Sequence, residues 1–582
     1  MNFVGIWRSP TASVAVLSAT PGPETRTITV PGVEMIVIGH CLATDALLAD
    51  GLTAVRVTGK PRQLTEWLGC YSLALLFSDE VTLIADPVGQ FPLYVCDVPD
   101  GALFGTNATD IAARANARLD RIHIAAGLIC PGALEVSDYR TPFHQVKQIP
   151  PGHLVRTGYS GRQLEKFDPV EPDKDLTFAD AAERLRLSLT AAVSARATET
   201  PFMTTDFSGG IDSTSLALLA HGWNHGVKGL TYRSPANPVH DDPVRAENYL
   251  RFAPGLRHHW VDGTAEDLPY QDLVPARDDP HVSSIATGPL RARLRLAAEL
   301  GSAVHLVGEG GDVVLGAPPA YLADLARRGD MGALWRHCVA WARIRQRSPL
   351  ALARHAVALA ATSRRRALLM LAASVGRATV PGEPLWEAEA IGYWDVPQTH
   401  WLAKPARAEL AAHIHAVADR TFDTMGVGDI VARGQLRTQV LTQRAVRHVG
   451  DEFGIAVHAP FLDSEVVRAC LSLPAFRRVD PTTPKPLLRT ALSGLVPEPV
   501  LTRPTKGDYT RSAYLGIRRA APALRRLLAD SAAADHGLIN PVPVRATLEG
   551  AVQGLPTPWG ALNQVFAVEV WLRDVSRKVA GV

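Results

Sequence analysis

The sequence predicts a sheet-rich α+β part at the N-terminus, followed by a larger α/β part. Short β-like runs, each bounded by Gly, Pro or Asp, fill about the first 165 residues, as in strands and hairpins. From about residue 200, strands and helices alternate, which indicates a parallel sheet with helices on both faces. The polar, proline-containing stretch 167–174 separates the two patterns, so we expect domains at 1–168 and 169–582.

Runs with strand or helix periodicity predict the individual elements. In the first part, strands are expected at 27–30, 34–38, 72–77 and 81–85. A helix capped near Thr177 opens the second part. Further strands are expected there at 201–207, 227–232, 258–261 and 303–307, and helices at 212–221 and 244–252. A basic helical insertion is expected at about 320–440.

Composition excludes several classes of protein. The 582 residues are 47% hydrophobic and 20% charged, which is ordinary for a globular protein. A net charge of +2 gives no field that would attract nucleic acid. The six cysteines form no CxxC pair, which argues against zinc or disulfides and favours the cytoplasm. Since the chain has neither a signal-peptide pattern nor about 20 uninterrupted apolar residues, we expect no secretion and no membrane span.

A glycine turn follows the strand that ends at Phe207 and opens a helix. The backbone N–H groups of Gly209 and Gly210, together with the N-terminus of the helix, would form a cradle for an anion. The hydroxyl groups of the turn can donate to phosphate oxygens, whereas Asp212 would repel phosphate and suits a Mg²⁺ ligand. The residues that carry these hydroxyls are Ser208, Ser213 and Thr214.

A second glycine-rich turn, from Gly308 to Asp312, also follows an apolar strand. Ligands bind beyond the carboxyl ends of parallel strands, so both turns lie where a site is expected. Three glycines and two acids on one turn are unfavourable for local stability. Asp312 suits a second metal ligand, and Glu309 suits a proton acceptor. An incidental glycine turn and a solvated acidic turn are the alternatives.

These motifs resemble those of the asparagine synthetase family. Residues 208–214 look like the pyrophosphate loop of the ATP pyrophosphatase superfamily, the adenine nucleotide α-hydrolases, and residues 308–312 look like the acidic loop of the family. The other matching segments are 86–94, 150–153, 459–463, 485–489 and 503–507. The resemblance implies an amidotransferase-like sandwich of the Ntn type, followed by an ATP-pyrophosphatase-like synthetase domain.

The resemblance also implies the reaction. ATP activates a carboxylate as an acyl-adenylate, pyrophosphate leaves, and an amine then displaces AMP. Mg²⁺ held by Asp212 and Asp312 would stabilise the developing charge, with Lys485 and Lys506 as cations for the departing phosphates. Glu309 is expected to take the proton from the attacking amine. An ordinary surface position is the alternative for each lysine.

The N-terminus departs from the glutamine-dependent members of the family, which begin with Met-Cys. Position 2 is Asn2, and the first cysteine is Cys41. Because an amide cannot replace a thiolate as the nucleophile, this part should not release ammonia from glutamine. Two groups of relatives share the missing cysteine: the β-lactam synthetases and the lasso peptide cyclases. The opening residues 3–8 and the length of the chain favour the lasso peptide cyclases.

A lasso peptide cyclase joins an Asp or Glu side chain of a core peptide to the N-terminal amine of that peptide. The resemblance thus implies ATP and Mg²⁺ as cofactors and a precursor core peptide as substrate. It implies a leader-binding protein and a leader peptidase as partners. We expect a large cavity that moulds the folded peptide. The alternatives are a β-lactam or other small-molecule amide synthetase, and a scaffold that binds ATP or a peptide without turnover.

Three further features of the sequence bear on substrate and partner binding. Between Arg327 and Arg377 there are eleven arginines and one acid, which suits docking of a peptide or protein, or a solvated helical face. Ala456 and His458 replace a Glu and an Arg of the family motif, which argues against aspartate as the substrate. The remaining candidates for nucleotide or substrate contacts are Asp241, Asp242, Tyr249 and His281, with a helix N-cap as the alternative for the two aspartates.

Overall fold

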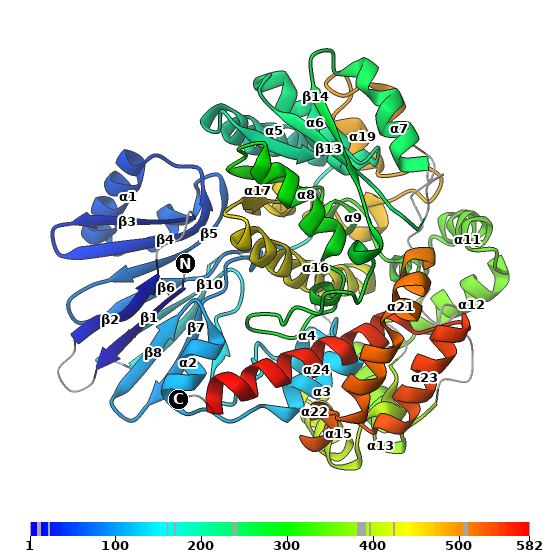
Figure 1. Cartoon of the computed structure of the whole chain (residues 1–582). Helices are drawn as coiled ribbons and strands as arrows, with labels where there is room; N and C mark the ends of the chain where they lie inside the picture. Colours follow the sequence, from blue (N-terminus) through cyan, green and yellow to red (C-terminus); the bar gives the residue numbers. More distant parts are fainter. Residues whose placement is uncertain are drawn as a thin grey trace.

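The computed structural model of the chain describes residues 2–8, 13–20, 24–159, 161–167, 170–236, 241–380, 391–394, 397–422, 425–503 and 510–580. The N-terminal strands, blue in Figure 1, lie at the left of the view, and the teal strands of a parallel sheet lie at the upper right. The dark-orange to red helices of residues 510–580 lie on the side of the molecule away from the parallel sheet (Figure 1). In the part of the chain that the structure describes, no helix has both the length and the apolarity needed to cross a membrane.

The N-terminal part contains two antiparallel sheets that pack face to face. Their strand orders are β2-β1-β8-β7-β9 and β11-β10-β6-β5-β4-β3. Phe3 and Phe104 of the first sheet and Ile36 of the second share one buried core, because side chains alternate between the two faces of a strand. The strands are β1 (Asn2–Arg8), β2 (Ser13–Thr20), β3 (Thr25–Val30), β4 (Val33–Cys41), β5 (Gly69–Leu76), β6 (Val81–Ile84), β7 (Tyr94–Val98), β8 (Gly101–Gly105), β9 (Lys147–Gln148), β10 (His153–Gly158) and β11 (Gly161–Lys166).

Four helices accompany these sheets. Leu48, Leu52 and Val55 of α1 bury against the outer face of the second sheet, which fixes this helix in place. The helices are α1 (Asp45–Thr58), α2 (Ala108–Ala115), α3 (Arg121–Ile129) and α4 (Leu134–Ser137). The four strands predicted in this part are confirmed as β3, β4, β5 and β6.

The α/β part is built on a five-stranded parallel sheet with the order β14-β13-β12-β15-β16. This confirms the parallel sheet and its predicted strands, to which β16 is an addition. The strands are β12 (Met203–Asp206), β13 (Lys228–Arg233), β14 (Arg257–Asp262), β15 (Val304–Leu306) and β16 (Ala456–His458). The helices among them are α5 (Phe178–Glu199), α6 (Ile211–Trp223), α7 (Asp241–Tyr249) and α8 (Gly288–Glu299). The central neighbours β12 and β15 carry the two glycine turns at their carboxyl ends.

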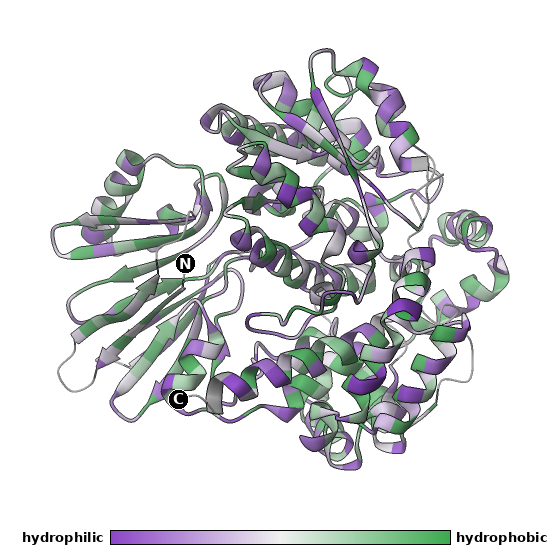
Figure 2. Cartoon of the chain, viewed as in Figure 1, coloured by the Kyte–Doolittle hydropathy of each residue, from purple (hydrophilic) through white to green (hydrophobic). Residues whose placement is uncertain are grey.

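Most of the remaining described residues are helical, which confirms the prediction of helices at about 320–440. The helices are α9 (Gly311–Val314), α10 (Leu322–Arg327), α11 (Met331–Arg345), α12 (Pro349–Ala360), α13 (Arg364–Arg377), α15 (Lys404–Ala418), α16 (Val427–Glu452), α17 (Ser464–Leu471), α18 (Ala475–Arg478), α19 (Pro486–Ala491), α20 (Glu498–Leu501), α21 (Thr510–Ala529), α22 (Ala532–Asp535), α23 (Pro541–Gln553) and α24 (Trp559–Ala580). Figure 2 shows hydrophobic and hydrophilic residues interspersed along α24. The hydrophobic residues of α24, such as Trp571, share one buried core with Leu368 of α13, Leu410 of α15 and Ile124 of α3.

This core joins the helical insertion to the N-terminal part, and buried polar contacts add to it. Arg364 of α13 is buried and forms two hydrogen bonds, of 3.0 and 2.6 Å, with the carboxylate of Glu135 in α4. The same guanidinium lies over the rings of Tyr393 and Trp394, at 4.7 and 4.9 Å. At least one arginine of the insertion therefore has an internal role, and neither docking nor a solvated face explains it.

Candidate active site

The first glycine turn connects β12 to α6 and is folded back onto the start of that helix. Gly209 has a positive φ of 77°, and a Cβ there would lie 2.4 Å from the carbonyl oxygen of Asp242, so only glycine fits. The Oγ atoms of Ser208 and Ser213 lie 2.8 Å apart, and the N–H of Gly210 donates to Ser208 Oγ at 3.2 Å. The turn therefore leads into the N-terminus of α6, where free N–H groups and the helix dipole favour an anion.

The second glycine turn packs directly against the first. A Cβ at Gly308 would lie 2.9 Å from the backbone nitrogen of Ser213, and one at Gly311 would lie 2.6 Å from Cγ of Asp212. Glycine at these positions lets the two turns approach each other. As a result, residues about 100 positions apart in the sequence form one site, as predicted from the carboxyl ends of neighbouring strands.

Lys485 joins the acidic residues of the two turns. Its Nζ contacts Oδ2 of Asp212 and lies 2.8 Å from Oδ1 of Asp312. Lys485 has a positive φ of 46°, which is strained for a lysine, and it precedes the first residue of α19. The two carboxylates offer the hard oxygen ligands that Mg²⁺ prefers, so this pair would suit a magnesium ion. The structure thus brings Lys485, Asp212 and Asp312 together, while Lys506 lies outside the described residues.

Glu309 is held by a residue that the sequence did not single out. Nε2 of Gln439, on α16, donates to Oε2 of Glu309 at 2.6 Å. Burial raises the pKa of Glu309 above its ordinary value, and the nearby carboxylates of Asp206 and Asp312 act in the same direction, against the Gln439 hydrogen bond. A raised pKa brings a carboxylate closer to the range in which a general base works. No local pattern connects Gln439 with Glu309, because 130 positions separate them.

Arg503 binds the backbone of the first glycine turn. Its Nη1 donates to the carbonyl oxygen of Gly209 at 2.7 Å, and its Nη2 forms an ion pair with Oδ1 of Asp242. Both side chains are buried. Asp242, predicted as a nucleotide or substrate contact, therefore acts on the turn through Arg503.

Two other predicted contacts pack within the fold. The buried Tyr249 donates its hydroxyl to the carbonyl oxygen of Pro499 at 3.0 Å, so it supports the region of α20. His281 accepts a hydrogen bond from the N–H of Ser283 at Nδ1, at 3.3 Å, and caps a short 3₁₀ turn. Burial lowers the pKa of His281 to about 4. The side chain of Asp241 lies outside what the structure describes.

The family motif changes at His458, and the structure shows what surrounds this residue. Nε of Arg196, on α5, donates to Nδ1 of His458 at 3.0 Å. The same guanidinium binds both carboxylate oxygens of Asp463, at 2.7 and 2.8 Å. His458 is thus part of a buried network at the end of β16, and Ala456 is at the start of that strand.

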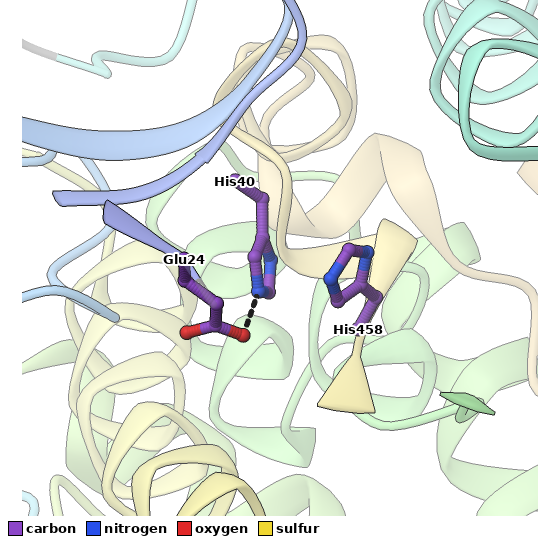
Figure 3. Close-up of side chains that lie close together, drawn as sticks. All are labelled: Glu24, His40 and His458. Atoms are coloured by element: carbon purple, nitrogen blue, oxygen red, sulfur yellow. Dashed lines mark hydrogen bonds and ion pairs between the residues drawn. The ribbon is translucent and has the colours of Figure 1, made fainter. Parts of the chain in front are cut away.

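His458 also meets two residues of the N-terminal part (Figure 3). Its ring stacks on that of His40 with centroids 3.6 Å apart, and Nε2 of His40 lies 2.6 Å from Oε1 of Glu24. One possible ligand atom from each of the three lies within 4.8 Å of the other two, a spacing that could suit a metal ion. Although burial alone would raise it, Arg447 and His40 hold the pKa of Glu24 well below its ordinary value.

The hydrogen bonds of this cluster do not fit a metal site. Arg196 donates to Nδ1 of His458, so the neutral ring carries its proton on Nε2 and offers no free lone pair. Arg447 donates to the second carboxylate oxygen of Glu24 at 2.7 Å and places a further positive charge beside the cluster. Glu24, His40 and His458 therefore form a polar contact between the two parts of the chain.

A cavity of about 530 Å³ opens beside the acidic turn. Asp312 and Gln439 line one end of it, α16 lines one side, and the insertion contributes Tyr393 and Trp394. The loop that follows α3, in the N-terminal part, also lines the cavity. Space for an acceptor substrate therefore adjoins Asp312 and the glutamine that binds Glu309.

Comparison with known proteins identifies a family and structural likenesses, two of which follow. A family model described as asparagine synthase matches residues 184–573. No curated protein shows significant similarity to the chain. Over 51% of its length, at 12% identity and a TM-score of 0.17, the chain is similar to a structure titled as the allosteric regulatory enzyme of purine biosynthesis, of which it covers 63%.

The second structure is a glutamine phosphoribosylpyrophosphate amidotransferase from B. subtilis, complexed with ADP and GMP. The match covers 53% of this chain and 68% of that one, at 11% identity and a TM-score of 0.19. Likenesses with such low TM-scores carry no weight for the fold or the function.

Proposed function

The chain belongs to the asparagine synthase family, whose members form amide bonds at the expense of ATP, and on this premise we propose that it is a lasso peptide cyclase. In this proposal the carboxylate of an Asp or Glu side chain in a leader-processed core peptide attacks the α-phosphate of ATP, and pyrophosphate leaves. The N-terminal amine of the same peptide then attacks the acyl-adenylate. AMP and a proton leave, and an isopeptide bond closes the macrolactam.

The cavity beside Asp312 is the observation that carries this proposal. Its volume of about 530 Å³ lies within the roughly 300–1,000 Å³ of pockets that bury a drug-sized ligand. A substrate of one small amino acid would leave most of this volume to water. The cavity is also lined by residues of both parts of the chain, as expected if it shapes a bulky acceptor.

The contacts around the two glycine turns suggest how each residue would act. The N–H groups at the start of α6 and the hydroxyls of Ser208 and Ser213 bind phosphate oxygens. Magnesium, held by Asp212 and Asp312, would neutralise charge that develops on the phosphates. Lys485 then lies close enough to bind the departing pyrophosphate.

Glu309 is assigned as the general base for the second step. Its carboxylate takes the proton that the nitrogen of the neutral amine loses as it attacks the acyl-adenylate, and Gln439 keeps the carboxylate oriented through the 2.6 Å hydrogen bond. The pKa of Glu309 is raised by burial, which makes it a stronger base than an exposed carboxylate. The predicted cation Lys506 would complete the phosphate site from the segment that follows Arg503.

The cysteines support an amine that comes from the substrate. All six are buried, and burial raises the pKa of each thiol. A buried neutral thiol is a poor nucleophile, so none of the six can take the place of the cysteine missing at position 2. With no thiolate to hydrolyse glutamine, the nitrogen must come from elsewhere, and in this proposal it is the N-terminal amine of the peptide. A leader-binding protein and a leader peptidase would supply the processed peptide.

Exchange of labelled pyrophosphate into ATP tests the adenylation half of this proposal. We expect exchange with a synthetic peptide that has an N-terminal glycine and one Asp or Glu further along. The same peptide with Asn or Gln at that position is the control and should give no exchange. Exchange with small β-amino acids and with none of the peptides would point to a β-lactam synthetase-like enzyme.

A further inference from the structure

The cavity beside Asp312 has a wall from the N-terminal part, and this wall suggests a specific role. We propose that loop 130–132 and one face of α16 together bind an uncharged peptide segment of about five residues. This inference rests on the proposed function, because it assumes a peptide acceptor. It gives the N-terminal part, which lacks a nucleophile, a direct role in binding the substrate.

The face of α16 that lines the cavity sets the length of the segment. Val431, Gln435, Thr438 and Thr442 line the cavity and are four, three and four positions apart, which places them on one face of a helix. At 1.5 Å per residue this face extends over roughly 16 Å. An extended chain rises about 3.3 Å per residue, so roughly five residues of peptide can lie along it.

The chemistry of the lining sets the class of ligand. The amide of Gln435 can donate to and accept from peptide groups. The hydroxyls of Thr438 and Thr442 donate to the carbonyl oxygens of Gly434 and Thr438, so they offer acceptors to peptide N–H groups. Pro131 and Trp394 also line the cavity and offer apolar surface to the side chains of a peptide. Among the described lining residues, only Asp312 and Arg345 carry a formal charge at neutral pH. The lining thus favours an uncharged stretch of polypeptide.

Loop 130–132 touches α16 so closely that the two form one surface. A Cβ at Gly434 of α16 would lie 2.3 Å from the carbonyl oxygen of Gly132, so glycine at 434 allows this contact. Cys130 and Pro131 of the loop, and Thr438 of α16, also line a neighbouring cavity of about 240 Å³. A peptide that follows α16 can therefore continue past the loop into this second space.

A bulky side chain at Gly132 tests the proposed wall. A Cβ built at Gly132 meets no atom closer than 3.9 Å, and its φ is not positive, so the backbone and Cβ of Gly132→Leu meet no clash. We expect the KM for the peptide to rise about tenfold or more, while ATP binding, followed with a fluorescent ATP analogue, stays unchanged. Gly222→Leu is the matched control, since Gly222 is exposed on α6 and its Cβ would meet nothing within 4 Å.

A second pair of variants tests the proposed peptide site if Gly132→Leu does not fold. Trp394→Ala should raise the peptide KM, whereas Trp335→Ala, an exposed tryptophan of the same insertion that does not line the cavity, should not. Unchanged peptide KM values in Gly132→Leu and Trp394→Ala would overturn the assignment of this site. If wild-type protein forms no AMP with any peptide, the proposed function fails instead, which is a separate result.

Discussion

At the scale of single residues, Lys485 contacts both carboxylates that the sequence predicts as metal ligands. Asp212 and Asp312 come from different turns, and each glycine contact that brings them together is too close for a side chain. A lysine so placed can balance the two negative charges and can also meet phosphate. The local pattern of glycine and acid was enough to predict Asp212 and Asp312, because both turns follow strands of a parallel sheet, whereas Lys485 was expected only from the resemblance to the asparagine synthetase family.

Removing either aspartate should stop adenylation. We expect Asp212→Ala and Asp312→Ala each to lower peptide-dependent pyrophosphate release by roughly 100-fold or more, because each removes a ligand for the ion that stabilises the phosphate charge. Release of pyrophosphate in a coupled assay measures this. Glu183→Ala, at an exposed position on α5, controls for the loss of an acid, and near-wild-type release by either site variant would contradict the assignment.

Replacing Glu309 should separate the two chemical steps. Glu309→Gln keeps the size of the side chain but removes the base, so we expect cyclisation to slow by roughly 100-fold while pyrophosphate exchange changes little. Single-turnover analysis of acyl-adenylate and product measures the two steps separately. Cyclisation at the wild-type rate would mean that another group takes the proton from the amine.

His281 should make the fold sensitive to acid. Its pKa is lowered to about 4 by burial, so between about pH 6.5 and pH 4 the unfolded chain binds a proton that the folded protein does not. Stability therefore falls as the pH falls through this window, by up to roughly 3 kcal/mol from this residue. Urea unfolding across the window should show a weaker pH dependence for His281→Asn than for wild type. The same change at exposed His225 is the control, and an unaltered slope in His281→Asn would refute the point.

At the scale of elements, the strand–turn–helix units could be predicted, whereas the contacts between distant elements could not. The mostly apolar run at 303–307 is followed directly by Gly308, and the run at 201–207 is followed by Ser208 and two glycines, so β12, β15 and their turns follow from local sequence. Gln439 reaches Glu309 from α16, and Arg503 reaches Gly209 and Asp242 from a distant segment. Such pairings depend on how helices pack, and no spacing in the sequence records them.

The arginine behind the first turn should matter for binding of ATP. Arg503→Met removes the hydrogen bond to the carbonyl oxygen of Gly209 and one partner of Asp242, which loosens the turn. We expect the KM for ATP to rise about tenfold, with the peptide KM unchanged. The double variant Arg503→Met/Asp242→Asn should recover stability, because it also removes the buried negative charge. An ATP KM like that of wild type would show that the turn keeps its shape without Arg503.

At the scale of the whole molecule, the N-terminal part is tied to the synthetase site by buried contacts. Gln90 donates to the carbonyl oxygen of Leu462 at 2.8 Å, and Leu462 packs against Gly310 in the acidic turn. His40 stacks on His458 nearby. The two architectures could be predicted from the sequence, but these contacts could not. Hydrophobic periodicity indicates whether a segment is a helix or a strand, but not which other segments pack against it. The N-terminal part, in which we expect no nucleophile, thus supports the geometry of the two glycine turns.

Mass spectrometry of a complete reaction tests the central claim most directly. The full chain is incubated with ATP, Mg²⁺ and a leader-free peptide that has an N-terminal glycine and one Asp or Glu further along. The account predicts a peptide lighter by one water, with AMP and pyrophosphate in equal amounts. Unchanged peptide, in the presence of a leader-binding protein and with no AMP formed, would contradict it and favour a protein that binds ATP or peptide without turnover.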